Sequence, residues 1–268
     1  MGLEVKNLGV TYRAASGAPI VALDGMDLRI ETGEFVSVIG PSGCGKSTLL
    51  HCLGGLLQQT SGEVEIHGKS VKAPDPKLAA FVFQDYTLLP WKTVVDNASI
   101  GLKFAGASKA EAREKGLEML RLVGLADFAK AYPTELSGGM QQRVAVARAI
   151  AMDPHIMLMD EPFGALDEQT RRHLGFEMSR ILTENERTVV MVTHSLDEAI
   201  LWADRLIVLS ARPGRIAREI RVEEPRPRKL QFVATPGFAE IRSELFGLLE
   251  TFHADAQQQV QEPTEAGP

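Results

Sequence analysis

A short glycine-rich segment contains the residue types that can hold a nucleoside triphosphate. Its residues, in order, are Gly40, Pro41, Ser42, Gly43, Cys44, Gly45, Lys46, Ser47 and Thr48. Glycines allow successive backbone N–H groups to curl around a phosphate, and a following helix N-terminus adds partial positive charge. Lys46 is placed to reach the terminal phosphates, and the Ser47 hydroxyl suits Mg²⁺. The segment predicts a triphosphate site but does not by itself separate kinases, GTPases and ATPases.

Cys44, inside this segment, allows two interpretations. A thiol near a helix N-terminus can lose its proton more readily and become reactive. Alternatively, Cys44 is a small residue that the loop tolerates, and this is the interpretation we prefer.

Two acidic residues follow a short apolar run. Residues 156–159 are all apolar, and Asp160 and Glu161 come directly after them. Ligands of open α/β sheets bind at the carboxyl ends of the strands. We expect Asp160 to hold Mg²⁺ through its water shell and Glu161 to polarise an attacking water. Acids also commonly begin helices, so this pair alone is weak evidence for a catalytic site. Its occurrence together with the glycine-rich segment strengthens that interpretation.

A second anion-binding surface is indicated by a serine and two glycines. Ser137, Gly138 and Gly139 precede a helical stretch that continues through Arg143. Free backbone N–H groups at such a helix start favour negative charge. One chain therefore has two half-sites for an anion.

The elements that position these residues can be predicted from hydrophobic runs. Five short apolar runs end at polar or glycine-rich turns and cover residues 35–39, 79–83, 156–159, 189–192 and 206–209. Such runs are typical of strands that are covered on both faces, as in a parallel sheet with crossover helices. The first thirty-odd residues instead alternate apolar and polar, which predicts an antiparallel β-layer with a turn at residues 14–19. The expected fold class is α/β.

Helical signals replace the strand pattern between Gln84 and Pro154. Ser108 and Glu111 form a capping-box pattern, and Gly124 is a suitable helix stop. A second helix is expected from about Gly139 to residue 152. We predict an α-helical lobe at about residues 85–153, inserted in a domain that spans residues 1–224.

The C-terminal part is expected to begin with an exposed connector. Pro225–Lys229 is rich in proline and basic residues, and one apolar stripe follows it at helical spacing. The stripe consists of Phe238, Ile241, Leu245, Leu248 and Phe252. We predict a connector and amphipathic helix at residues 225–253 and a disordered polar tail at residues 254–268.

Composition narrows the partners of the chain. A formal net charge of -6 and 44% hydrophobic residues give a large core and no basic field for nucleic acid, so we expect no nucleic-acid partner. Two cysteines fit a reducing compartment and argue against a disulfide framework. No signal peptide or membrane-spanning run is evident, so we expect any membrane link to come through a partner.

Taken together, these motifs resemble the ABC ATPase family, whose signature usually reads Leu-Ser-Gly-Gly-Gln. Here Leu136-Ser137-Gly138-Gly139 is followed by Met140 in the fifth place. The resemblance covers nearly the whole chain in family order and adds four residues, which are Tyr12, Gln84, Asp167 and His194. It implies a P-loop NTPase core of the RecA-like type that binds ATP and Mg²⁺.

The resemblance also implies a role for each of these residues. Tyr12 would stack on adenine, and Gln84 would join the core to the helical lobe and contribute to catalysis and to the Mg²⁺ site. Asp167 would communicate across a dimer, and His194 would hydrogen-bond the γ-phosphate. Each has a plainer alternative, such as sheet packing for Tyr12 or helix capping for Asp167.

A transport function is the preferred interpretation. In the family, two cassettes pack head to tail, so the partners implied are a second ATPase subunit, identical or closely paralogous, and a transmembrane permease. Three segments, Leu88–Trp91, Asp160–Asp167 and Ser210–Arg215, together resemble those of nitrate, sulfonate and taurine importer ATPases. This resemblance implies an extracytoplasmic binding protein and a peripheral location on the cytoplasmic face of the inner membrane. The alternative is a soluble ABC ATPase in cytosolic assembly or repair. The single cassette and short lobe without sustained heptads favour transport.

Overall fold

A six-stranded sheet forms the centre of the molecule. The computed structural model describes residues 2–14, 17–164 and 167–261. The sheet has the order β10-β9-β3-β8-β7-β6, in which only β10 is antiparallel to its neighbour. Its strands are β3 (Phe35–Ile39), β6 (Ala79–Val82), β7 (Ile156–Asp160), β8 (Thr188–Val192), β9 (Arg205–Leu209) and β10 (Ile216–Arg221). The predicted α/β core is confirmed, because the continuous apolar runs are strands buried on both faces.

A second, antiparallel sheet lies beside this core. It has the order β2-β1-β4-β5 and consists of β1 (Leu3–Arg13), β2 (Pro19–Ile30), β4 (Ser61–Ile66) and β5 (Lys69–Ser70). Leu3 pairs with Ile30 and Val5 with Leu28, and all four side chains are buried. The alternating pattern of the N-terminal residues thus has its expected cause, one buried and one exposed sheet face.

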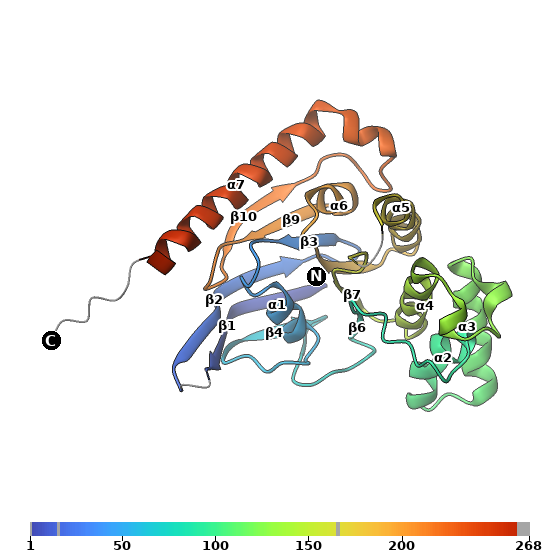
Figure 1. Ribbon diagram of the computed structural model, residues 1–268. Helices are drawn as coiled ribbons and strands as arrows, with labels where there is room; N and C mark the ends of the chain where they lie inside the picture. The colour runs from blue at the N-terminus through green and yellow to red at the C-terminus, as the bar shows by residue number, and fades with distance from the viewer. Residues whose placement is uncertain (1, 15–16, 165–166, 262–268) are drawn as a thin grey trace.

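Helix α1 (Lys46–Leu53) fills the space between the two sheets (Figure 1). Leu49 and Leu50 are completely buried and belong to one apolar cluster with residues of both sheets. This packing fixes the N-terminus of α1, and with it the glycine-rich segment, relative to the carboxyl end of β3.

The opposite face of the central sheet is covered by α5 (Glu168–Glu184), α6 (Leu196–Trp202) and α7 (Pro236–Gln261). Figure 1 shows α7 running along the edge that contains β9 and β10. The helix extends beyond residue 253, where we expected it to end, because residues 254–261 are mostly alanine and glutamine, which favour helix. Residues 262–268 of the expected tail lie outside the described part of the chain.

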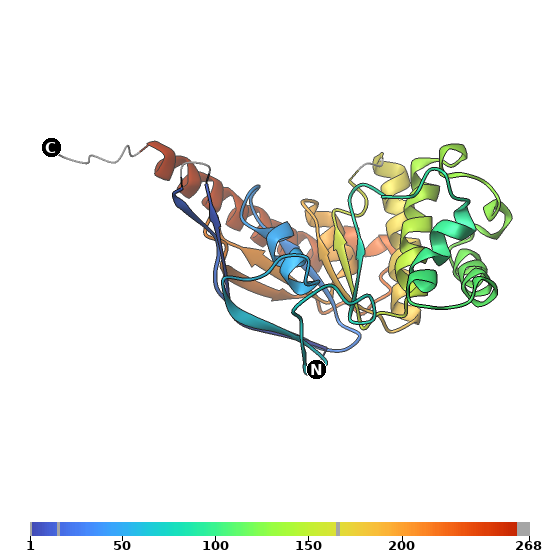
Figure 2. The ribbon, with the colours of Figure 1, turned by 90° about the horizontal axis from the view of Figure 1, so that it is seen from below.

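Three helices between β6 and β7 form a lobe at one end of the molecule (Figure 2). They are α2 (Val94–Phe104), α3 (Lys109–Leu122) and α4 (Gly138–Ala151), with the short 3₁₀ helices η1 (Ala126–Phe128) and η2 (Pro133–Glu135) between α3 and α4. The capping box of Ser108 and Glu111 is present at α3, and Gly124 follows the helix with a φ of 69°. The capping residues thus mark both ends of α3 as the sequence predicted.

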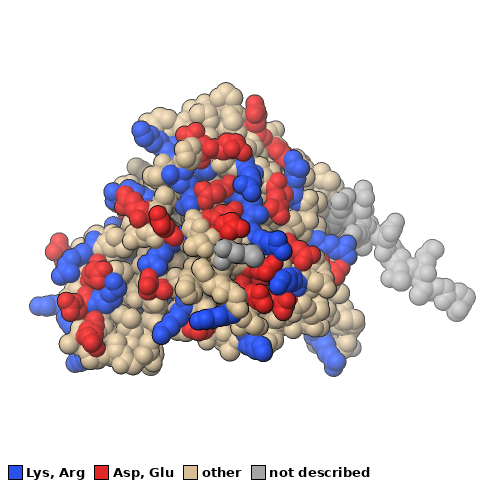
Figure 3. Space-filling model, turned by 180° about the vertical axis from the view of Figure 1, so that it is seen from behind, with Lys and Arg blue, Asp and Glu red and all other residues tan. Residues whose placement is uncertain are grey.

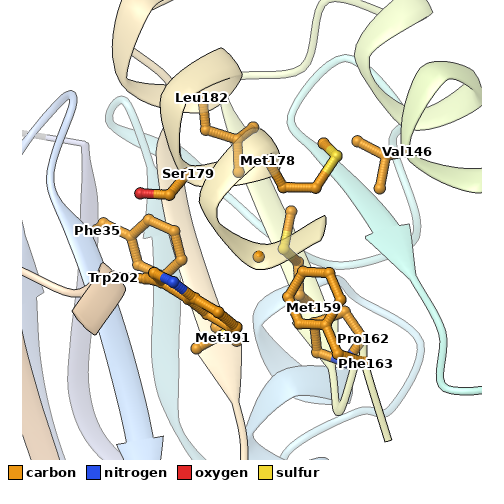
Figure 4. Close-up of a pocket in the computed structure, with 11 residues that line it drawn as sticks. Phe35, Val146, Met159, Pro162, Phe163, Met178, Ser179, Leu182, Met191 and Trp202 are labelled. Carbon is orange, nitrogen blue, oxygen red and sulfur yellow. The ribbon is translucent and has the colours of Figure 1, made fainter. Parts of the chain in front are cut away.

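The lobe, the sheet and α7 share one continuous apolar cluster. Leu120 of α3, Val144 of α4, Met159 of β7 and Leu245 of α7 all belong to it. A cavity of about 10 Å³ lies in this cluster beneath α5 (Figure 4). It is lined mainly by apolar side chains, including three methionines, and is about the size of one water molecule.

The connector at residues 225–229 is exposed only in part: Pro225, Pro227 and Lys229 are exposed as predicted, whereas Arg226 is half-buried and Arg228 is buried. Arg228 is only 4% exposed, and its guanidinium donates hydrogen bonds to backbone carbonyls at the end of α6 and after β10. Arg226 pairs with Asp204 at 2.7 Å and lies over the Phe35 ring. At these two arginines the prediction was wrong, because carbonyl groups and an aromatic face satisfy their charges in place of water.

The 3₁₀ helix η3 (Leu230–Ala234) links this connector to α7. Charged side chains of both signs are interspersed on the face in Figure 3. No helix in the described ranges is long and apolar enough to cross a bilayer.

Candidate functional site

The glycine-rich segment forms a loop between β3 and α1. Gly43 and Gly45 have φ angles of 75° and 103°, in the left-handed region that favours glycine. Lys46 Nζ donates hydrogen bonds to the carbonyl oxygens of Gly40 at 2.8 Å and Pro41 at 3.0 Å. The loop therefore holds the ammonium group over its own backbone, next to the N-terminus of α1.

Cys44 lies beneath this loop rather than in its mouth. The side chain is 1% exposed, and burial raises the pKa of its thiol, although nearby Lys46 acts in the opposite direction. A Cβ added to Gly40 would lie 2.8 Å from Cys44 Sγ, so the loop packs tightly on the sulfur. The structure favours the interpretation of Cys44 as a small packing residue.

A cavity of about 280 Å³ opens above the loop. It is lined by Tyr12, Ala22, Ser42, Gly43, Gly45, Lys46, Ser47, Thr48, Glu161 and Arg212. The Tyr12 and Thr48 hydroxyl oxygens lie 3.2 Å apart, so Tyr12 is fixed at the rim with its ring partly exposed. The structure brings the predicted aromatic residue, the loop and one of the two acids to a single cavity.

Arg212 was not among the predicted site residues. Its guanidinium donates hydrogen bonds to the Gly43 carbonyl at 3.1 and 3.3 Å, and the side chain lines the same cavity. In the sequence, Arg212 was noticed only as part of the segment Ser210–Arg215, which resembles the importer ATPases. Its contact with the loop could not be predicted, because the two segments are far apart in the sequence. Arg212 adds positive charge where an anion would bind.

The two acids at the end of β7 have different surroundings. Burial raises the pKa of the Asp160 carboxyl group, and the nearby Ser47 side chain partly opposes this shift. Glu161 has a φ of 44° and donates its backbone N–H to the Val192 carbonyl at 2.9 Å. A glutamate with its backbone in the left-handed region is uncommon, and this conformation costs free energy. Such strain is concentrated at functional sites.

The Glu161 carboxylate contacts one predicted residue, His194, and shares the surroundings of Gly164 with another, Gln84. Its Oε2 lies 3.1 Å from His194 Nδ1, which follows β8. A Cβ added to Gly164 would lie 3.6 Å from Glu161 Oε2 and 3.5 Å from Gln84 Nε2. Segments after β6, β7 and β8 thus bring a glutamine, a glutamate and a histidine to one place at the carboxyl edge of the sheet.

The second predicted anion-binding surface lies on the helical lobe. Ser137 is the N-cap of α4, and its Oγ accepts a hydrogen bond from the Met140 backbone N–H at 3.3 Å. A Cβ added to Gly139 would lie 2.8 Å from Leu174 Cδ1. The side chain of Met140, the unusual fifth residue, packs against the apolar cluster, while its backbone N–H takes part in the cap of α4.

A separate cavity of about 300 Å³ adjoins this helix start. It is lined by Ser137, Gly139, Met140, Arg143, Gln169, Thr170, His173 and Leu174. Gly138 lies in the first turn of α4 between two of these residues. This cavity and the cavity above the glycine-rich loop share no lining residue, and Figures 1 and 2 show α1 and α4 apart. One copy of the chain does not bring the two surfaces together.

Asp167 is the N-cap of α5, close to this second cavity. Its Oδ1 accepts a hydrogen bond from the Thr170 backbone N–H at 3.0 Å, and the Thr170 hydrogen bonds hold the pKa of the carboxyl below its usual value. The residues before it, 165 and 166, lie outside the described part of the chain. The helix-capping alternative for Asp167 is thus correct, and a cap can also serve a contact with a partner.

Comparisons with known proteins agree with this arrangement. A family model described as ABC transporter matches residues 23–164. An uncharacterized ABC transporter ATP-binding protein of Methanocaldococcus jannaschii is 46% identical over 92% of this chain and 91% of its own length. A taurine import ATP-binding protein of Rhizobium johnstonii is 42% identical, with coverage of 93% and 97%. A nitrate import ATP-binding protein of Synechocystis sp. is also 42% identical, with coverage of 93% and 95%.

Solved structures show the same fold. A dimeric ATP-binding cassette in a post-hydrolysis state with ADP and phosphate matches with a TM-score of 0.72 and 36% identity. The match covers 83% of this chain and all of that chain. With the family match, the two anion-binding surfaces and the acids at the end of β7, this leads to one conclusion: the chain belongs to the ABC transporter family and is one of its ATPases.

Proposed function

We propose that this chain is the ATP-hydrolysing subunit of an importer and powers uptake of a small solute through a separate permease. The relatives named for taurine and nitrate import support this proposal. A bicarbonate transport ATP-binding protein of Synechocystis sp. is 44% identical over 92% of this chain, which covers 38% of that protein. The substrate class is nitrate, a sulfonate such as taurine, or a related small solute. The permease would hold the chain at the cytoplasmic face of the membrane.

The separation of the two anion-binding surfaces is the observation that carries the proposed mechanism. Ser137, Gly138 and Gly139 of one copy would face the γ-phosphate that Lys46 and Ser47 of a second copy hold. ATP would then bridge the copies, and its hydrolysis would release them. The dimeric state of the solved neighbour with ADP and phosphate supports this arrangement.

The contacts around Glu161 support its assignment as the general base for the attacking water. Its carboxylate is 3.1 Å from the His194 ring, so His194 would orient that water and hydrogen-bond the γ-phosphate. Gln84, which follows β6, would contact the same attacking water. Tyr12 at the rim would stack on adenine, and Asp167 would contact the partner copy.

Mg²⁺ fits the oxygen ligands beneath the loop. The Ser47 hydroxyl lies close enough to the Asp160 carboxylate to lower its pKa, and Gln84 can add an amide oxygen. Mg²⁺ prefers oxygen ligands and normally keeps several waters and phosphate oxygens in its shell. The ion would neutralise phosphate charge, while Ser47 and Asp160 hold it in place.

The segment after Gln84 supports a permease contact. Arg148 donates hydrogen bonds to the Tyr86 and Thr87 carbonyls at 3.0 and 2.8 Å, and Leu88 packs against the apolar cluster. Trp91 is nevertheless 71% exposed. An exposed tryptophan on a segment that hydrogen bonds and packing hold in place is suited to binding an apolar protein surface.

Trp91→Ala is therefore expected to reduce transport more than ATP hydrolysis. In proteoliposomes with the permease, uptake per ATP hydrolysed should fall at least roughly three-fold, because a buried interfacial tryptophan commonly contributes more than 1 kcal/mol. Phe104→Ala, at an exposed position on the same lobe, is the matched control. Normal coupling in the Trp91 variant would remove this residue from the interface.

The importer proposal itself is tested by isolation of the chain from its native cell. We expect a multispanning permease to co-purify with it and deletion of the chain to abolish uptake of one small solute of the proposed class. Purification with a cytosolic assembly or repair complex, and uptake that is unchanged by deletion, would overturn the proposal.

A further inference from the structure

A buried carboxylate next to the site has no role in the mechanism described above. Glu198 is on α6, four residues after His194, and is only 7% exposed. Burial raises the pKa of its carboxyl group, which a hydrogen bond from Thr193 and the charges of Arg171 and His194 partly oppose. A buried acid is costly to the fold unless its contacts compensate for lost hydration.

Glu198 first binds the segment that contains His194. The Thr193 hydroxyl donates a hydrogen bond to Glu198 Oε2 at 2.7 Å and accepts one from the Ser195 backbone N–H at 3.0 Å. Ser195 in turn caps α6 by accepting from the Glu198 backbone N–H at 3.3 Å. These three bonds close a turn whose central residue is His194, so the position of the imidazole depends on the carboxylate.

The other oxygen of Glu198 faces a different element. Oε1 lies 3.7 Å from Arg171 Nε, and Arg171 is in the first turn of α5, where its backbone N–H bonds to the Asp167 carbonyl at 2.8 Å. The side chains of both Arg171 and Glu198 are largely enclosed, so their attraction is screened less than that of an exposed pair. One carboxylate thus touches the turn around His194 and the start of α5.

We infer that Glu198 is a positioning residue that links the His194 turn to the first turn of α5. Its contact with Thr193 holds the His194 ring next to Glu161. Its contact with Arg171 couples the position of that ring to the start of α5, where Asp167 is the N-cap. Movement of Asp167 at a dimer contact would therefore change the geometry of His194. The inference rests on the proposed roles of His194 and Asp167.

Thr193→Val tests the link to His194 because it removes one hydroxyl and keeps the side-chain shape. We expect kcat for ATP hydrolysis to fall roughly ten-fold, as when a hydrogen bond that orients a catalytic group is lost. KM for ATP should stay within about two-fold, since the nucleotide contacts are untouched. Thr193→Ser, which restores a hydroxyl, should recover most of kcat.

Glu198→Gln tests the charge that faces Arg171. The amide can still accept from Thr193, but the ion pair is lost, so kcat should fall less than in Thr193→Val and the ATP-dependent dimer should weaken. Asp197→Asn is the matched control, because the neighbouring carboxylate pairs with Arg242 of α7 at 2.9 Å and both side chains of that pair are partly exposed. That control should keep the wild-type kcat and dimer.

Thermal unfolding of each variant separates positioning from loss of the fold. An unchanged kcat in both Thr193→Val and Glu198→Gln would overturn the inference, as would failure of Thr193→Ser to recover activity. Failure of the proposed function looks different, because the wild-type chain would then lack ATPase activity or hydrolyse ATP normally with Glu161→Gln.

Discussion

At the residue scale, Glu161 owes its position to the backbone as much as to its neighbours. The backbone at Glu161 is in a left-handed conformation that few non-glycine residues adopt. Its N–H is anchored to Val192 of β8, and this directs the carboxylate to His194. The strain at this residue is compensated by the strands on either side, which is the usual arrangement where geometry matters for catalysis.

Replacing Glu161 by glutamine is expected to lower the ATP hydrolysis rate at least roughly 100-fold, because a general base commonly contributes that much. Affinity for ATP should change little, since the amide keeps the shape and the phosphate loop is intact. Phosphate release and binding of a fluorescent ATP analogue measure the two effects. Glu186→Gln is the control, because Glu186 is an exposed glutamate with a similar φ of 50°. Hydrolysis at the wild-type rate would exclude Glu161 as the base.

Cys44 gives a prediction about chemical reactivity. Burial raises the pKa of the Cys44 thiol, and raises that of Cys52 to about 11. Both thiols should therefore be protonated and shielded at neutral pH, and their reactivity should rise only at alkaline pH. Alkylation followed by mass spectrometry is expected to label neither cysteine in the native protein at pH 7 and both in urea. Rapid labelling of native Cys44 that ATP prevents would restore the reactive-thiolate interpretation.

At the element scale, the C-terminal segment is part of the folded domain. Arg228 bonds to carbonyls at the end of α6, and Arg242 of α7 pairs with Asp197 near the start of α6. Both ends of the helix that follows His194 are thus held by residues beyond position 225. Deletion of this segment would expose apolar surface and leave the last carbonyls of α6 without their donor.

Arg228→Met is expected to reduce the free energy of unfolding by about 2–3 kcal/mol, because buried carbonyls lose a charged donor. Burial lowers the pKa of Arg228 to about 10, so the guanidinium is still charged at neutral pH and the loss should be constant near pH 7. Urea unfolding measures it. Lys229→Met, at the exposed neighbouring position, should change stability by less than about 0.5 kcal/mol. Equal stability of the two variants would contradict the proposal that Arg228 stabilises the end of α6 through its carbonyl groups.

The sequence predicted the elements whose patterns have local causes. The run 35–39 is β3 because both of its faces are covered, and Ser108 starts α3 because it meets an N–H three residues later. Within the connector at 225–229, the burial of Arg228 was not predicted, since its acceptors lie in α6 and just after β10 and only the fold brings them together. Likewise, the positions of Gln84 and Arg212 in the sequence do not indicate which atoms each of them lies near in the fold. Long-range contacts are set by packing, which a single sequence does not display.

At the scale of the whole molecule, the two anion-binding surfaces lie in separate cavities of one copy, and the proposed mechanism brings them together across two copies. Ser137→Arg in the Glu161→Gln background is expected to abolish an ATP-dependent dimer, because the larger side chain would occupy the surface that faces the partner's nucleotide. Size-exclusion chromatography with and without ATP measures this. Ala110→Arg, on the exposed surface of the same lobe, should leave the dimer intact. Persistence of the dimer in the Ser137 variant would place the interface elsewhere.

The apolar cluster that joins the lobe to the sheet and α7 has a consequence for how such proteins can diversify. Leu120 and Val144 of the lobe belong to the same interior as Met159 and Leu245, so the lobe cannot be exchanged between cassettes as a unit without disturbing the centre of the molecule. A chimera would inherit mismatched interior shapes. Substitutions at outward-facing positions such as Trp91 would leave this interior in place, so a surface of the lobe can change its binding properties without any change in the packing behind it.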